Sequence, residues 1–112
     1  MIQQQFEVQS AYQAAMNRQF YAACAGLSAE QLAKDNGIFF KSVIGTLNHM
    51  LLTDRIWLAT FQNEKYAYES LGQILYADLA ELREAREATD ADIAVWLSGV
   101  TDEQLQAGFH DR

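Results

Sequence analysis

Proline is absent from this sequence of 112 residues, and glycine occurs only six times. Folds built from many short strands need tight turns between them, and proline and glycine are among the residues most used in such turns. Hydrophobic residues make up 50% of the chain and charged residues 21%, which is typical of a globular domain with one core. The sequence therefore predicts one all-α domain, residues 1–112, built from a few long helices.

Three long segments show the spacing of apolar side chains, every three or four residues, that is typical of helices. They span residues 6–25, 38–62 and 71–98, and Gly26 and Gly99 follow the first and the third of them. The apolar residues that recur in the first segment are Val8, Tyr12, Met16, Phe20 and Ala23. We expect the three long helices to form an up-down bundle.

A short motif follows the first and the third helix in similar form. Residues 26–32 read Gly-Leu-Ser-Ala-Glu-Gln-Leu, and residues 99–105 read Gly-Val-Thr-Asp-Glu-Gln-Leu. Ser28 stands three residues before Gln31, which is the pattern of a capping box, in which each side chain bonds the backbone N–H of the other residue. Both motifs predict a helix end, a cap and a new short helix.

The second helix carries polar side chains at a strict spacing of seven residues, at Lys41, Asn48, Arg55 and Gln62. Nearly all its other positions are apolar or small. Seven residues make about two helical turns, so each of these four side chains lies nearly in line with the next. Together they form one narrow stripe along the helix. We expect this stripe to face solvent, on a helix that neighbours surround on its other sides.

The third helix divides into two faces. The expected inner face consists of Leu75, Leu79, Leu82, Ala85, Thr89, Ile93, Trp96 and Leu97. The expected outer face consists of Glu81, Arg83, Glu84, Arg86, Glu87 and Asp90.

Only four residues follow Gly108, so we expect the fourth helix of the bundle to be missing or supplied by another chain. The apolar groove left between the three helices would be larger than the apolar patches that soluble monomers usually expose. A second copy of the chain is the simplest cover for it, which predicts a homodimer.

The net charge of −7 lies in the second half of the chain. Residues 1–62 carry four acidic and four basic side chains, whereas residues 63–112 carry eleven acidic and four basic ones. Such a surface repels phosphates, which argues against a nucleic-acid partner. The most apolar segment, residues 43–61, is interrupted by polar and charged residues, so we expect no membrane span. A single cysteine and the lack of a secretion signal favour a cytoplasmic protein.

His49 is the most informative candidate for a functional site. It lies midway along the second helix, one turn after Gly45. A glycine there leaves space beside the imidazole for a ligand or a metal ion; the alternative is a core histidine hydrogen-bonded to a neighbouring helix. Asp54 lies about 140° away round the helix and is not expected to share a metal with His49. We expect it to pair with a basic side chain or a helix-end amide.

The remaining reactive or large side chains have simpler interpretations. Cys24 ends the first helix, where the helix dipole disfavours a thiolate, so we expect a small buried hydrophobic residue. His110 stands beside Asp111 and is expected to be solvated, and Trp57 and Trp96 are expected in the core. The sequence contains none of the Glu-x-x-His, Cys-x-x-Cys, phosphate-loop or Gly-x-Ser-x-Gly motifs.

Residues 46–58, Thr-Leu-Asn-His-Met-Leu-Leu-Thr-Asp-Arg-Ile-Trp-Leu, are similar to the second helix of the DinB family, four-helix-bundle proteins of bacteria. Further similarity lies in residues 11–18, Ala-Tyr-Gln-Ala-Ala-Met-Asn-Arg, and in residues 75–88, which begin Leu-Tyr-Ala-Asp-Leu. The resemblance therefore extends over nearly the whole chain and implies a DinB-like bundle.

The resemblance also implies a metal site. In that family a histidine of the second helix joins two histidines of a His-x-x-x-His segment on the last helix to hold a divalent metal, with positions open for water or substrate. His49 matches the first of these ligands, and the other two have no counterpart in this chain. A zinc or nickel ion is thus expected in intact relatives but absent or weakly bound here, since catalytic sites use about three protein ligands.

Two functions follow as expectations. The first is a divalent-metal-dependent enzyme of DinB type, such as a thiol-dependent transferase with a small-molecule or thiol substrate, whose metal site is incomplete in this chain. The alternative is a non-catalytic oligomeric helical-bundle module that has lost the metal site. Neither the catalytic residues nor the substrate follows from the sequence.

Overall fold

The computed structural model describes residues 2–37 and 40–105, and it confirms an all-α bundle. Over these residues the elements are α1 (Ile2–Cys24), α2 (Ala29–Ala33), α3 (Val43–Phe61) and α4 (Leu79–Gly99). A short helix over residues 102–105 follows α4.

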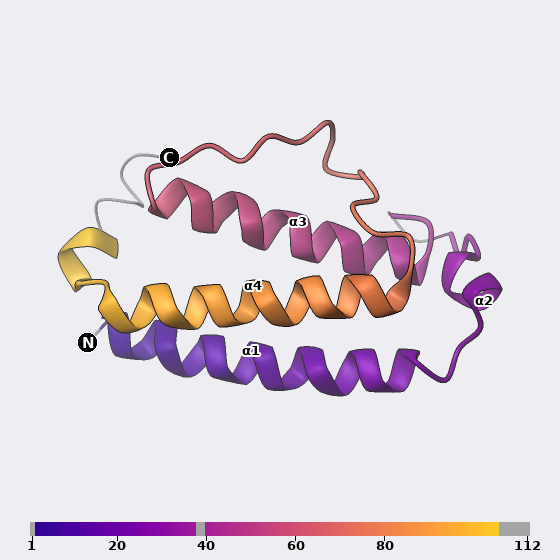
Figure 1. Cartoon of the computed structure of the whole chain (residues 1–112), viewed down its shortest axis with the longest axis horizontal. Coiled ribbons are helices and arrows are strands. Elements are labelled where there is room, and N and C mark those ends of the chain that lie inside the picture. The colour runs from indigo at the N-terminus through magenta and orange to yellow at the C-terminus, as the bar shows by residue number, and fades with distance from the viewer. Residues whose placement is uncertain (1, 38–39, 106–112) are drawn as a thin grey trace.

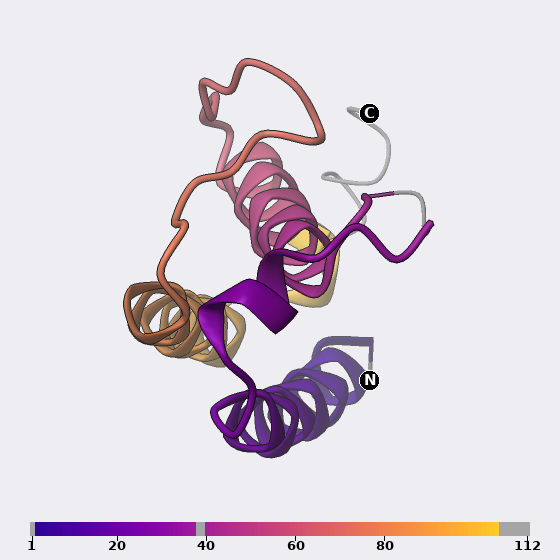
Figure 2. The ribbon, with the colours of Figure 1, turned by 90° about the vertical axis from the view of Figure 1, so that its right-hand side faces the viewer.

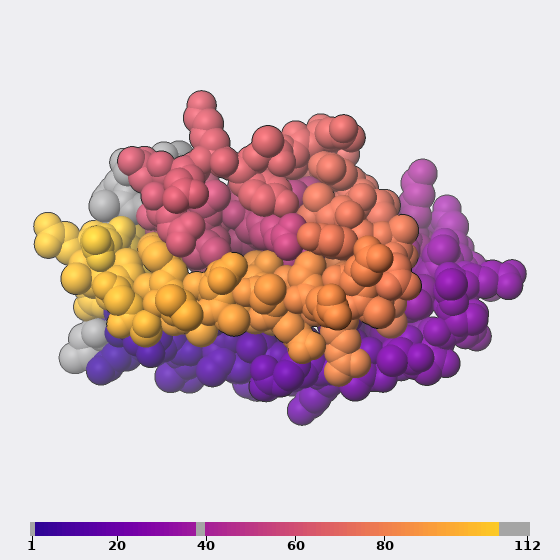
Figure 3. Space-filling view, viewed as in Figure 1, coloured from indigo at the N-terminus to yellow at the C-terminus, as the bar shows by residue number. Residues whose placement is uncertain are grey.

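The three long helices lie roughly side by side, with α4 in contact with both α1 and α3 (Figures 1 and 2). α1 runs antiparallel to α3 (Figure 1). α4 runs in the same direction as α3, because the segment of residues 62–78 crosses back along the length of the molecule before α4 begins (Figure 1). In the space-filling view α4 forms the middle of one face, with α1 on one side of it and the crossing segment on the other (Figure 3). The crossing segment thus covers the side of α3 that carries Asn48.

The two later helices begin further along the chain than their apolar spacing predicts. α3 begins at Val43, because the Ser42 side chain accepts the N–H of Gly45 at 3.0 Å and caps the helix, and Lys41 has a left-handed backbone with φ 73°. α4 begins at Leu79, where the Asp78 carboxylate accepts the N–H of Glu81 at 3.1 Å. Residues 71–78, predicted to be helical, belong instead to the crossing segment.

The capping box predicted at Ser28 is present, and the second motif, for which a cap was predicted, forms one as well. The Ser28 hydroxyl accepts the N–H of Gln31 at 3.0 Å, and the Gln31 side chain accepts the N–H of Ser28 at 2.9 Å. Thr101 and Gln104 exchange the same two bonds at 3.1 and 2.9 Å. The repeated motif is therefore a repeated helix exit.

The core consists of two apolar clusters. One lies near α2 and contains Tyr21, Cys24, Leu32, Ile44, Leu47, Leu51, Leu82 and Ala85. The other lies at the opposite end and contains Leu58, Ile93, Leu97, Val100 and Leu105, with Trp57 and Trp96 packed against it. The predicted inner face of the third helix is confirmed except for Leu75, which packs against the core from the crossing segment. Both tryptophans pack against the core, as predicted, and are half-buried.

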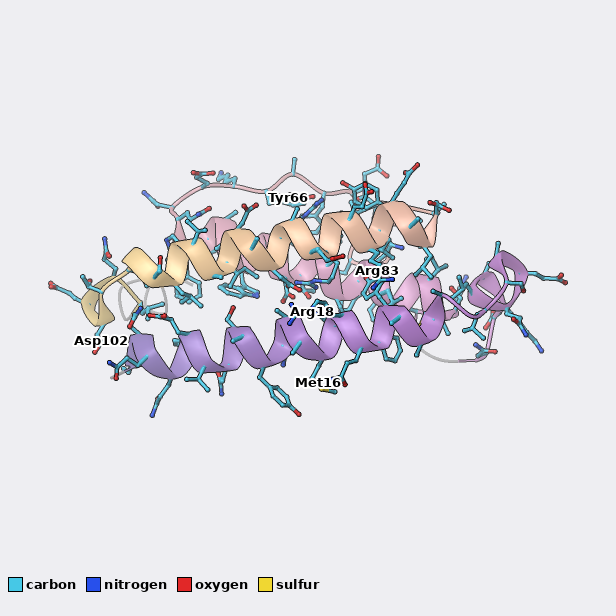
Figure 4. The ribbon with its side chains drawn as sticks, turned by 60° about the horizontal axis from the view of Figure 1, so that its bottom comes forward. Met16, Arg18, Tyr66, Arg83 and Asp102 are labelled. Atoms are coloured by element: carbon cyan, nitrogen blue, oxygen red, sulfur yellow. The ribbon has the colours of Figure 1, made fainter. Side chains whose placement is uncertain are left out.

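The recurring apolar residues of α1 lie on its outer face. Val8, Tyr12, Met16 and Phe20 are all exposed, whereas the buried residues of this helix are Tyr21 and Cys24. Figure 4 shows Met16 pointing away from α4. α1 therefore has two apolar sides, of which α4 covers one.

None of the helices that the model describes is both long enough and apolar enough to cross a membrane.

Candidate functional site around His49

The middle of the polar stripe lies inside the molecule, so its predicted exposure is wrong for two of its four residues. Asn48 has an exposed fraction of 0% and Arg55 is half-buried, whereas Lys41 and Gln62, at either end of α3, are exposed. The crossing segment lies over this side of the helix and supplies polar partners that the sequence pattern does not reveal. Asn48 and Arg55 therefore bind a segment of the same chain.

Asn48 makes all the hydrogen bonds that a carboxamide can make. Its Nδ2 donates to the carbonyl oxygens of Ile44 at 2.8 Å and Tyr76 at 2.9 Å. Its Oδ1 accepts the backbone N–H groups of Leu75 at 2.8 Å and Tyr76 at 2.9 Å. One buried side chain thus satisfies three backbone groups of a segment that has no regular secondary structure, and it fastens that segment to α3.

Arg55, two turns further along α3, contacts both the segment and α4. Its guanidinium donates to the hydroxyl oxygens of Thr89 at 3.2 Å, Tyr66 at 3.2 Å and Tyr76 at 3.4 Å. Its Cζ also lies 5.6 Å from the centroid of the Tyr76 ring, within the range of a cation–π contact. Figure 4 shows Tyr66, which belongs to the crossing segment, next to α4.

His49 is half-buried, and its ring is held on two sides. Its Nδ1 lies 2.9 Å from the carbonyl oxygen of Leu71 in the crossing segment. The Phe40 ring stacks on the imidazole with centroids 3.8 Å apart and an interplanar angle of 19°. The partner predicted for a core histidine was a neighbouring helix; the observed partner is the crossing segment.

The space expected beside His49 at Gly45 is filled. A Cβ at Gly45 would lie 2.3 Å from the carbonyl oxygen of Phe40 and 3.2 Å from the Ser42 hydroxyl oxygen. The glycine therefore allows the chain entering α3 to pass close to the helix, and the interpretation of Gly45 as room for a ligand is wrong. An apolar cleft of about 350 Å³ lies instead between the end of α1, α2 and the start of α4, and His49 is not among its lining residues.

A buried ionic cluster crosses the middle of the bundle. Arg86, 2% exposed, donates to Asp90 Oδ1 from Nε at 3.0 Å and from Nη2 at 2.6 Å, and its Nη2 lies 2.7 Å from Asp54 Oδ2. Asp54 Oδ1 accepts the Trp57 indole N–H at 3.0 Å, and Asp90 Oδ2 accepts the Asn17 amide at 3.1 Å. The cluster joins all three long helices, and it confirms the basic partner predicted for Asp54.

The outer-face assignment of Arg86 and Asp90 is consequently wrong. Both are charged residues at positions that continue the inner stripe of α4, because Arg86 follows Leu82 by four residues and precedes Thr89 by three. That spacing is the sequence signal for their burial. It identifies a charged residue on an apolar face, although it does not identify the partners on α1 and α3.

Two further reactive groups are buried beside this cluster. Cys24 is buried, as predicted, and burial raises the pKa of its thiol. Burial raises the pKa of the Tyr21 hydroxyl to about 12, while nearby Arg86 lowers it and Asp90 raises it. The Tyr21 hydroxyl has no hydrogen-bond partner within the described part of the chain. Neither group is ionised at neutral pH, so both act as packing residues.

The described residues contain no group of three His, Cys, Asp or Glu side chains that could hold a metal ion. His49 and Asp54 do not converge, as predicted, since one contacts the crossing segment and the other contacts Arg86. His110, predicted to be solvated, lies outside the described residues.

Comparison with known proteins assigns the chain to a family. The DinB family model matches residues 1–111, which is nearly the whole chain. No curated protein and no solved structure gives a significant match. The predicted resemblance is therefore confirmed along the three long helices that carry Asn48, His49 and the ionic cluster, and the chain belongs to the DinB family.

Proposed function

We propose that this chain is a DinB-type divalent-metal-dependent protein in which His49 supplies one ligand to a zinc or nickel ion. The supporting observation is the state of the imidazole: Nδ1 bonds the Leu71 carbonyl, and no described residue hydrogen-bonds Nε2. A histidine whose other nitrogen bonds a carbonyl is the usual form of a metal-ligating histidine. A cytoplasmic, thiol-dependent transferase acting on a small molecule is the activity proposed by family analogy.

The donor set does not fit a complete catalytic site. Such sites use about three protein ligands, and the described residues contain no group of three His, Cys, Asp or Glu side chains, with or without His49, that could hold a metal ion. One imidazole competes poorly with water for a metal ion. We therefore derive no catalytic step through a metal, and we propose that the site in this chain is incomplete.

A metal titration tests this proposal. The purified chain should retain less than one zinc or nickel ion per chain after dialysis, measured by elemental analysis, and calorimetric titration should show weak binding that is lost in His49→Ala. His110→Ala is the matched control and should bind like the unsubstituted chain. Tight equimolar binding that disappears in His49→Ala would contradict the incomplete site and would imply ligands from another chain. Weak binding unaffected by His49→Ala would remove the metal proposal itself.

A specific surface favours the second candidate function, an oligomeric interaction module. Val8, Tyr12, Met16 and Phe20 follow one another at intervals of four residues and are 43–70% exposed. Side chains at this spacing form a continuous ridge along a helix, and two such ridges interdigitate in the commonest class of helix packing. We propose that this α1 ridge packs against the α1 ridge of a second copy.

The charge distribution supports a second copy as the occupant. The residues between the ridge side chains on the outer side of α1 are Gln9, Gln13 and Gln19, which are uncharged. A two-fold contact places each residue near its own counterpart or that of a neighbour, so charged side chains in it would repel one another. The chain as a whole has a net charge of −7, yet this face can meet its own copy without like-charge repulsion.

Light scattering coupled to size exclusion tests the homodimer. The measured mass should be twice the 12.7 kDa of the chain, and Val8→Glu should shift it to the monomer. Val95→Glu is a matched control, because Val95 on α4 is 72% exposed and Val8 is 70% exposed, and it should leave the mass unchanged. A well-folded monomer at high concentration, or equal effects of the two substitutions, would contradict the α1 interface.

A further inference from the structure

We propose that Asn48 is a positioning residue for His49: it fastens the crossing segment so that the Leu71 carbonyl holds the imidazole as the Nδ1–H tautomer and leaves Nε2 as its one basic nitrogen. The inference rests on the proposed function in one respect, which is that Nε2 is the nitrogen that binds the metal ion. The tautomer itself requires no bound metal, so the two proposals can fail separately.

The tautomer follows from the chemistry of the contact. A backbone carbonyl oxygen only accepts hydrogen bonds, so the 2.9 Å contact with His49 Nδ1 requires a proton on Nδ1. A neutral imidazole carries one proton, so Nε2 then holds the lone pair. In the absence of such a bond either nitrogen can carry the proton, and the hydrogen-bond partner decides which one does.

The carbonyl is held in place by a chain of short contacts that begins at Asn48. Three of the four hydrogen bonds of Asn48 go to Leu75 and Tyr76. A turn connects this anchor to Leu71, because the N–H of Gln73 donates to the Ser70 carbonyl at 3.1 Å and the Gln73 side chain accepts the N–H of Glu69 at 2.8 Å.

The positions of Asn48 and His49 on α3 explain how Asn48 can position the His49 imidazole. Asn48 and His49 are adjacent, so their side chains leave the helix about 100° apart and reach different points of the same crossing segment. Phe40 stacks on the imidazole and restricts its rotation. Asn48 is fully buried and fully hydrogen-bonded, so it is the most rigid attachment of the segment beside His49.

Nitrogen-15 NMR of the histidine side chains tests the inference at a pH where both imidazoles are neutral. The His49 signals are identified by their absence in His49→Gln. In the unsubstituted chain Nδ1 should be protonated and Nε2 unprotonated. In Asn48→Ala this pattern should be lost in favour of a mixture of tautomers, with faster hydrogen exchange at the amides of Leu75 and Tyr76.

Thr53→Ala is the matched control, because Thr53 lies one turn after His49 and its hydroxyl bonds the Met50 carbonyl of α3 itself. It should leave the tautomer unchanged. If Asn48→Ala does not fold, Gln73→Ala loosens the turn between the anchor and Leu71 and should produce the same mixture. A protonated Nε2 in the unsubstituted chain overturns the inference, as does an unchanged tautomer when the Leu75 and Tyr76 amides exchange faster.

Addition of zinc chloride to the same samples separates the two proposals. A shift of the Nε2 signal alone supports both. An Nδ1–H tautomer that zinc does not affect supports the positioning role and contradicts the metal proposal. Zinc binding through Nδ1 contradicts the positioning role while retaining His49 as a ligand.

Discussion

Replacing Arg86 by alanine should lower the free energy of unfolding by about 3–5 kcal/mol, a large share of the stability of a domain of this size. Arg86 is 2% exposed, and its guanidinium contacts the carboxylates of Asp54 and Asp90 at 2.6–2.7 Å. Without it, the bundle would contain two neighbouring carboxylates with no cation between them, and water cannot fully solvate either. Urea unfolding followed by circular dichroism measures the loss.

Arg83→Ala is the matched control for this prediction. Arg83 lies on the same helix, its side chain is 40% exposed, and its Nε lies 3.7 Å from Glu87. Exposed ion pairs of this kind contribute about 0.3–0.5 kcal/mol. Arg86→Lys should rescue only part of the loss, because an ammonium lacks the planar fork that reaches both carboxylates. Equal losses for Arg83→Ala and Arg86→Ala would show that the ionic cluster does not support the fold.

Replacing Leu51 by alanine should lower the free energy of unfolding by about 2–5 kcal/mol. Leu51 has an exposed fraction of 0% and lies in the apolar cluster of α1, α3 and α4 near α2, so its truncation leaves a cavity that close-packed neighbours cannot collapse to fill. Thermal and urea unfolding measure the change.

Leu71→Ala removes the same atoms from a side chain that is 49% exposed, and it should lower the stability by much less. If the free energy of unfolding falls equally in both leucine variants, the assignment of Leu51 to the core is wrong. The comparison also tests the orientation of α3, since a rotation that placed Asn48 in solvent would move Leu51 toward the surface with it.

The helices and their caps could be predicted from the sequence because the interactions that create them are local. Each cap joins two residues that are three apart, Ser28 with Gln31 and Thr101 with Gln104. A short sequence motif therefore contains both partners. The starts of α3 and α4 were predicted five and eight residues too early. Leu75 follows the helical spacing yet packs against the core from the crossing segment, and a cap at Asp78 marks the true start of α4.

The candidate site was predicted only in part. His49 is singled out by its place midway along the most apolar helix and by its match to the family motif. The pairing of Asp54 with a base follows from the need to compensate a half-buried charge. The sequence pattern places Asn48 and Arg86 in solvent, because polar residues on amphipathic helices usually face water. Their partners lie on the crossing segment and on other helices, far away in sequence, and no periodicity within one helix contains that information.

The sequence by itself determined the class of fold, the three long helices, the capping boxes and the family, since each depends on composition, local spacing or a contiguous motif. The tertiary structure alone decided which sides of those helices are inside. Burial of a polar group requires its partner, and here the partners are the backbone of residues 71–76 for Asn48 and His49, and carboxylates of α3 and α4 for Arg86. Because these contacts form only when the helices pack and the segment crosses α3, the inner polar surface is a property of the folded chain.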